Sequence, residues 1–161
     1  MRNVRRTVIA LPVLFFGALT TGLQGRVLAQ TSAAGPLVEV WKSPTCGCCK
    51  DWVKYMESNG FSVKVNDVPN SAGMRARLGM DEKFGSCHTA TVGGYVLEGH
   101  VPARDVRRLL KEKPAAVGLA VPGMMIGSPG MDGPEYGGRK DPYDVLLVKA
   151  NRTASVYQSY R

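Results

Sequence analysis

The chain has 161 residues, with 21 basic and 13 acidic side chains and a formal net charge of +8. This length is enough for one domain with a hydrophobic core. Residues 1–29 hold four of the arginines and no acidic residue, so the rest of the chain carries 17 basic and 13 acidic side chains, a net charge of +4. So small an excess does not indicate a nucleic-acid-binding protein.

The N-terminus has the pattern of a secretory signal peptide. Basic residues precede the mostly apolar segment 7–23, and small residues at 27–29 offer a cleavage site. The apolar segment is short and interrupted by proline and glycine, which favours cleavage over retention as a membrane anchor. We therefore expect a signal peptide at 1–29, a flexible lead-in at 30–36 and the folded domain at 37–161. The mature protein would be exported and have no membrane span.

Three cysteines cluster where a predicted strand is followed by a predicted helix. The apolar run 37–41 predicts a buried strand, and the apolar spacing of residues 52–56 predicts the helix. Cys46, Cys48 and Cys49 then lie at the helix N-terminus, where free N–H groups stabilise thiolates. Cys46 and Cys49 have the C-x-x-C spacing and can reach each other, so they are our candidate redox pair. Cys48 points about 100° away from Cys49 on a helix, which makes it an additional thiol.

The next elements follow the order of a thioredoxin-like α/β domain. We expect a strand at 61–65, a short helix at 72–78, a hairpin of strands at 89–92 and 95–97, and a helix at 102–113. The first strand, helix and second strand imply a parallel pair with a right-handed crossover. The whole would be a mixed central sheet flanked by helices.

In the thioredoxin-like fold, the loop before the third strand packs against the cysteine-headed helix. Here that loop is 85–89, so the fold would bring Cys87 and His88 beside Cys46 and Cys49. Thioredoxins carry a cis-proline in this loop, and this chain has no proline there. That difference disfavours ordinary exchange with substrate disulfides.

The C-terminal part begins with a segment rich in glycine, proline and methionine. Seven glycines and three prolines among residues 118–138 predict a loop that contains neither helix nor strand. Met124, Met125 and Met131 lie in this loop, either as gap-fillers or as thioether ligands for Cu(I). A second hairpin, with strands at 144–148 and 154–157, is expected to extend the sheet.

The candidate metal site consists of Cys46, Cys48, Cys49, Cys87 and His88. Thiolates with one imidazole select soft or borderline metals, Cu(I) or Zn²⁺. The spacing does not match structural zinc sites. Five donors exceed what one Cu(I) needs, so bridging thiolates could hold several ions.

The second histidine, His100, precedes a predicted helix. We expect it to make a structural hydrogen bond, and a metal contact from it stays open.

These motifs resemble those of the CopG-type family of periplasmic copper-resistance proteins, long catalogued as a domain of unknown function. The matching stretches are SPTCGCCKDW (43–52), SCHTATVGGYVLEGHVP (86–102) and GLAVPGMMIGSPGM (118–131). The resemblance implies a thioredoxin-like fold, Cu(I) bound by the clustered cysteines and histidine, and a copper-linked redox role in bacterial metal resistance. It also implies a periplasmic location.

Our leading hypothesis is an exported copper-binding protein that holds Cu(I), as a multinuclear thiolate cluster, and couples thiol redox to copper redox. One alternative is a thiol–disulfide oxidoreductase that acts through Cys46 and Cys49. Another is a copper chaperone that delivers ions to an efflux partner. The additional thiol of Cys48 and the absent cis-proline favour metal binding over disulfide exchange. Expected partners are copper ions and an efflux or electron-transfer protein, with no nucleic acid.

Overall fold

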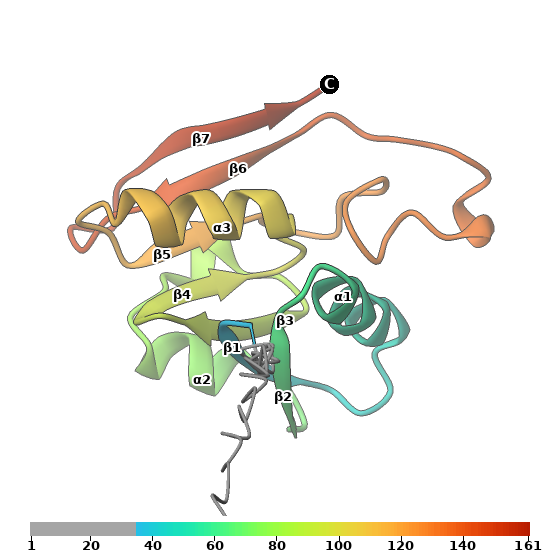
Figure 1. The fold of residues 1–161 in the computed structure, drawn as a ribbon, viewed down its shortest axis with the longest axis horizontal. Coiled ribbons are helices and arrows are strands. Elements are labelled where there is room, and N and C mark those ends of the chain that lie inside the picture. Colours follow the sequence, from blue (N-terminus) through green and yellow to red (C-terminus); the bar gives the residue numbers. More distant parts are fainter. Residues whose placement is uncertain (1–34) are drawn as a thin grey trace, which may run out of the picture. The chain divides into compact units, whose positions relative to one another are not determined.

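A mixed seven-stranded β-sheet forms the centre of the described structure (Figure 1). The computed structural model describes residues 35–161, which belong to one compact unit. The predicted signal peptide, residues 1–29, and most of the predicted lead-in lie outside the described residues, so both remain predictions. Within residues 35–161, no helix is long and apolar enough to cross a membrane.

Strands and helices alternate through the first part of this unit, and strands dominate its C-terminal part. The elements are β1 (Leu37–Lys42), α1 (Gly47–Ser58), β2 (Ser62–Asp67), α2 (Ala72–Arg77), the 3-10 helix η1 (Glu82–Phe84), β3 (His88–Val92), β4 (Tyr95–Glu98), α3 (Ala103–Glu112), β5 (Gly118–Ala120), the 3-10 helix η2 (Pro134–Tyr136), β6 (Tyr143–Val148) and β7 (Ala154–Tyr160). The strand order is β2-β1-β3-β4-β5-β6-β7. The pairs β1–β2 and β4–β5 are parallel, and the other neighbours are antiparallel. The predicted mixed α/β architecture is confirmed.

Each face of the sheet has its own apolar core. Because alternate residues of a strand point to opposite faces, Leu97 and Leu119 pack with residues of α1 and α3, whereas Val96 and Ala120 pack beside Phe84 of η1. Helices α1 and α3 therefore cover one face, and the segment around η1 covers the other. The cysteine-bearing end of α1 lies on the first of these faces.

The side chain of Trp52 anchors α1 to the sheet. It is fully buried, and its indole N–H donates to the carbonyl of Val101 at 3.0 Å, so the polar atom of a buried indole is satisfied. The helix ends at Ser58 with Asn59 as its C-cap, and Gly60 follows with a φ of +77°, a left-handed conformation that glycine adopts readily. Trp52 lies one turn beyond the cysteines, so its packing determines where the first turn of α1 points.

The prediction that residues 118–138 contain neither helix nor strand is wrong. Gly118–Ala120 forms β5, a buried strand between β4 and β6, and Pro134–Tyr136 forms η2. A Cβ on Gly118 would overlap the backbone of Val96 in the neighbouring strand β4. Glycine thus marks a close approach of two strands here, which composition alone does not distinguish from a loop.

The segment between β5 and β6 lies beside α1 (Figure 1). At Gly130, where φ is +80°, a Cβ would lie 2.6 Å from the backbone nitrogen of Trp52 and 2.7 Å from the carbonyl oxygen of Cys48. Real Cβ atoms do not approach other atoms so closely, so only glycine fits. The segment therefore contacts the backbone of the cysteine-bearing turn directly.

We expect Gly130→Ala to destabilise the protein through this contact. The positive φ alone costs about 1–2 kcal/mol, and forcing the segment off the helix adds about 1–3 kcal/mol. Gly79→Ala is the matched control, because Gly79 has a φ of +79° but a Cβ added there would meet no atom within 4 Å. Denaturant unfolding of both variants measures the difference. Equal losses in the two variants would show that the contact with α1 contributes nothing.

Candidate metal centre

The N-cap and the first turn of α1 carry three of the four cysteines. Cys46 is the N-cap of α1, in an extended conformation, and Cys48 and Cys49 lie in the first helical turn. Cys46 and Cys49 form a disulfide with a Cα–Cα distance of 5.3 Å. Cys48 and Cys87 are free thiols. The redox pair predicted from the C-x-x-C spacing is therefore bonded in this structure.

The fourth cysteine comes from the loop before β3. The sulfur of Cys49 lies 3.7 Å from the carbonyl oxygen of Cys87, and the sulfurs of Cys46 and Cys48 are 3.5 Å apart. All four sulfurs lie within 4.8 Å of one another. Cys48 points away from Cys49 on the helix, but it still belongs to this group. Its sulfur lies beside that of Cys46, which precedes the helix as its N-cap. The structure thus brings all four predicted thiols together.

A second group of donors shares Cys87 with the first. One donor atom each of Cys87, His88 and His100 lies within 4.8 Å of the others. The sulfur of Cys87 is 3.0 Å from Nε2 of His100 and 3.4 Å from Nδ1 of His88. The other nitrogen of His100 lies 2.7 Å from the carbonyl oxygen of Pro129. His100 therefore makes the predicted hydrogen bond to the backbone and also contacts the site.

Burial controls the protonation of this group. The pKa of His88 is lowered well below its usual value, first by complete burial and then by the neighbouring His100. Burial also lowers the pKa of His100. The pKa of Cys87 is raised to about 12, chiefly by burial and then by the nearby Cys48. Burial therefore favours the neutral form of both imidazoles and the protonated thiol of Cys87.

A buried ion pair holds the loop that carries Cys87. Arg75 donates from Nε to Oε1 of Glu98 at 2.9 Å, and both side chains are almost fully buried. Glu98 accepts the backbone N–H of Ser86 at 2.7 Å, and Arg75 donates to the Ser86 carbonyl at 3.0 Å. The second oxygen of Glu98 accepts the hydroxyl of Thr89 at 2.7 Å. The residues on either side of Cys87 and His88 are thus bound to one carboxylate, whose pKa burial nevertheless raises.

The methionines of the C-terminal segment have different surroundings. Met124 is exposed, Met125 packs against the main core, and Met131 is buried with its sulfur 3.2 Å from the hydroxyl of Tyr136. The pKa of Tyr136 is raised by burial and, next, by Cys48. Of the three methionines, Met131 is therefore the one whose sulfur is buried against a polar group.

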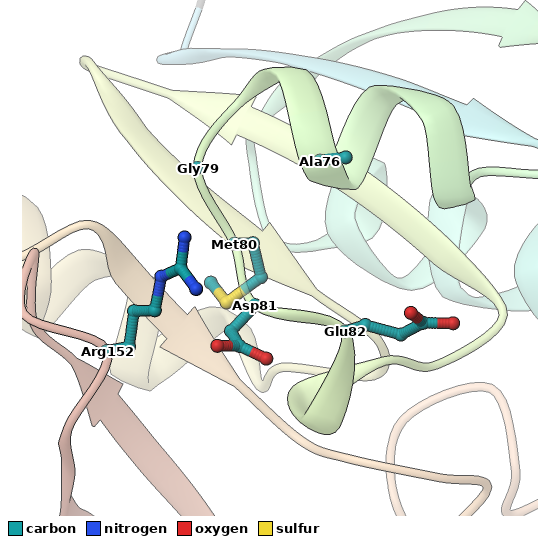
Figure 2. Close-up of a pocket in the computed structure, with 6 residues that line it drawn as sticks. All are labelled: Ala76, Gly79, Met80, Asp81, Glu82 and Arg152. Carbon is teal, nitrogen blue, oxygen red and sulfur yellow. The ribbon is translucent and has the colours of Figure 1, made fainter.

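A surface pocket of about 350 Å³ lies at a different place, between the α2–η1 segment and the β6–β7 turn. Figure 2 shows Met80, Asp81 and Arg152 around it, and none of its lining residues is a cysteine or histidine. The cysteines and histidines of the candidate metal centre therefore lie outside this pocket.

Sequence reasoning did not assign His100 to the site, although a signal was present. The hairpin turn Gly93-Gly94 sets the register of β3 and β4, in which Thr89 pairs with Glu98. Counting outward from this pair places Cys87 opposite His100. Arg75 gave no such signal, because its partner Glu98 is 23 residues away.

Known proteins of similar sequence and fold indicate the family of this chain. A family model described as a protein of unknown function, DUF411, matches residues 84–131. One solved structure, described as copper resistance protein copG, form 2, is 42% identical, with a TM-score of 0.73 over 79% of this chain and 99% of its own. Form 1 is 43% identical, with a TM-score of 0.71 over 77% of this chain and 96% of its own. Comparison with curated proteins gives no match.

The fold and the clustered thiols define a mixed α/β protein with a cysteine-rich site of the kind that can hold a soft metal ion. The similarity to the two solved structures extends over nearly their whole length. The chain belongs to the CopG-type copper-resistance family.

We expect Glu98→Gln to destabilise the protein by about 3–5 kcal/mol, because it leaves the Arg75 guanidinium buried without its charge partner. The loop should also loosen, so that the Cys87 thiol reacts faster with an alkylating reagent in the folded protein. Glu112→Gln is the control, since Glu112 pairs with Arg108 at the surface, where an ion pair contributes little to stability. Equal melting temperatures for the two variants would contradict the role assigned to Glu98.

Proposed function

We propose that this protein is an exported Cu(I)-binding protein whose ligands are Cys46, Cys48, Cys49, Cys87 and His88. The observation that carries the proposal is the convergence of four sulfurs, from two segments 37 residues apart, within 4.8 Å of one another. Thiolate sulfur is the donor that Cu(I) prefers. The names of the similar structures support copper as the metal.

The reduced site is proposed to hold several Cu(I) ions as a thiolate cluster. Cu(I) accepts two or three ligands, so four thiolates and one imidazole exceed the needs of a single ion. A thiolate can bridge two ions, and Cys48 is close enough to Cys46 to share one with it, at 3.5 Å between the sulfurs. The redox state of the pair Cys46 and Cys49 then decides whether two of the ligands are available.

The disulfide supports a coupling of thiol redox to copper redox. When Cys46 and Cys49 form their bond, two thiolates lose two electrons, which reduce two Cu²⁺ to two Cu⁺, and any thiol protons go to solvent. Reopening the disulfide takes two electrons from a donor protein, the expected electron-transfer partner. The pair would in this sense be the catalytic residues of a copper-linked oxidoreductase.

We further propose a thioredoxin-like fold for the first half of the domain. The order β2-β1-β3-β4, with β1 and β2 parallel and the other two pairs antiparallel, supports this. The pattern of residues 1–29 supports export to the periplasm, where a copper-efflux protein is the expected recipient of the ions.

The main alternative is a thiol–disulfide oxidoreductase that acts on protein cysteines. The Cys46–Cys49 disulfide fits that activity as well as it fits copper chemistry. The free thiols of Cys48 and Cys87, beside the disulfide, have no part in a two-cysteine exchange mechanism. They favour the copper-binding function.

The first test is the amount of metal bound. Titration of the fully reduced protein with Cu(I) in the absence of oxygen should give more than one ion per chain. Cys48→Ser should lower this number, because a hydroxyl is a poor ligand for a soft ion. A single ion per chain, in both the wild type and the variant, would contradict the cluster.

The second test is the role of Cys87. Cys87→Ser should weaken Cu(I) binding by at least about tenfold in competition with a chelator, since it removes a direct ligand and even the loss of a residue that only orients a ligand costs this much. Circular dichroism should show an unchanged fold, and the disulfide between Cys46 and Cys49 should still form.

The alternative function predicts the reverse order of effects. Reduction of a model protein disulfide would then be abolished by Cys49→Ser and unaffected by Cys87→Ser. A folded Cys87→Ser protein with wild-type Cu(I) affinity would remove Cys87 from the metal site.

A further inference from the structure

Both histidines of the chain lie beside the one cysteine thiol that the loop before β3 supplies. The chain has two histidines. His88 begins β3, His100 follows β4, and the hairpin keeps them close through the hydrogen bond from the Gly99 N–H to the His88 carbonyl, at 2.9 Å. Their rings are 5.0 Å apart, edge to face, and Cys87 contacts both.

The lone pair of His100 points at the sulfur of Cys87. A carbonyl oxygen can only accept a hydrogen bond, so the contact with Pro129 at 2.7 Å places the proton of the neutral ring on Nδ1. Nε2 is then unprotonated, and it faces the Cys87 sulfur at 3.0 Å. A histidine that binds a metal usually donates its other ring N–H to a backbone carbonyl or carboxylate in this way, which fixes the orientation of the ring.

The ring of His88 is fixed in place but incompletely satisfied. It is fully buried, with Trp52 at 4.4 Å between ring centroids and His100 at 5.0 Å. Its Nε2 has no hydrogen-bond partner, and among the described residues it is the only buried side-chain nitrogen or oxygen of which this is true. Such an atom costs about 1–3 kcal/mol. The nitrogen that faces the Cys87 sulfur is the other one, Nδ1, at 3.4 Å. It is Nδ1 that is placed to bind an ion, and the cost of the unpartnered Nε2 is present with or without the ion.

The disulfide state determines which donors are free. With Cys46 and Cys49 bonded, the thiols that remain are those of Cys48 and Cys87. The all-sulfur site then has only two of its four cysteines free as ligands, whereas all three donors of the group of one thiol and two imidazoles are free.

We propose that Cys87, His88 and His100 form a second metal subsite, which binds one borderline divalent cation such as Cu²⁺ or Zn²⁺ while the Cys46–Cys49 disulfide is closed. Two imidazoles and one thiolate suit such ions better than they suit Cu(I). On binding, the thiol of Cys87 loses its proton to solvent and forms the sulfur–metal bond. No electron is transferred, and the disulfide is unchanged.

The distances between the donors fit this role. Metal–sulfur and metal–nitrogen bonds of about 2.3 and 2.0 Å at a tetrahedral angle place the two donor atoms about 3.5 Å apart. The sulfur of Cys87 is already 3.0 and 3.4 Å from the two nitrogens. The two sulfur–nitrogen distances would therefore have to lengthen by only a few tenths of an ångström.

The subsite shares Cys87 and His88 with the proposed Cu(I) site, and to that extent it rests on the proposed function. Because Cys87 belongs to both sites, an ion in the second subsite stays bound to Cys87 when the Cys46–Cys49 disulfide is reduced. The ion then lies beside the two new thiolates.

Co²⁺ is the probe for the experiment, because it reports thiolate ligation by its charge-transfer absorption and does not oxidise thiols. Protein with the disulfide closed, verified by a count of two free thiols, is titrated with Co²⁺ without oxygen. One ion per chain with a thiolate charge-transfer band is expected. His100→Asn, whose amide can still donate to Pro129, should weaken binding by at least about tenfold. Glu112→Gln, at a surface ion pair with Arg108, is the control and should bind as the wild type does.

Three results would overturn the subsite: no thiolate band in the oxidised wild type, wild-type affinity in a folded His100→Asn protein, or an equal loss of affinity in Glu112→Gln. If His100→Asn does not fold, ¹⁵N spectra of the wild type replace it. Zn²⁺ should shift the ring nitrogens of both histidines, and unshifted ring nitrogens would overturn the proposal.

The same measurements separate this inference from the proposed function. Reduced protein that binds several Cu(I) ions, beside oxidised protein that binds no Co²⁺, refutes the subsite alone. Oxidised protein that binds Co²⁺ through His100, beside reduced protein without Cu(I) affinity, refutes the Cu(I) site alone and supports the subsite.

Discussion

The position of the Cys87 thiol depends on one buried carboxylate, that of Glu98. The carboxylate is inaccessible to solvent, and it binds the N–H of Ser86, the hydroxyl of Thr89 and the guanidinium of Arg75. A charge at this depth is tolerated only with such a complete set of partners. If the loop moved away from the sheet, the buried carboxylate would lose these hydrogen-bond partners. The same interactions that stabilise the buried charge therefore hold Cys87 against α1.

Much of the fold could be predicted because the signals were local. Alternation in the strands, the apolar face of α1 and the Gly93-Gly94 turn each depend on residues close in sequence. The predicted gathering of Cys87 with the three clustered cysteines combined these local signals with the expected order of the strands. The described structure agrees with that gathering, since all four sulfurs lie within 4.8 Å.

The parts that could not be predicted depend on contacts between distant residues. Strand β5 has three residues, too few for a periodic pattern, and its glycine is explained only by the approach of Val96. The role of Arg75 requires knowing that Glu98 lies beneath the loop. His100 is an intermediate case: its pairing with Cys87 follows from the hairpin register, but the carbonyl of Pro129 that orients its ring comes from the C-terminal segment. The roles of these residues in metal binding remain proposals.

The two cysteines of the disulfide differ in exposure. Cys46 is half-buried, whereas Cys49 is fully buried against the carbonyl of Cys87. A thiol that attacks a disulfide must approach one sulfur along the line of the bond and expel the other. A reductant from solution therefore reaches Cys46 and forms the mixed disulfide there, and the thiolate that it expels is that of Cys49. Reduction releases the new thiolate into the interior of the site, on the side away from the reductant.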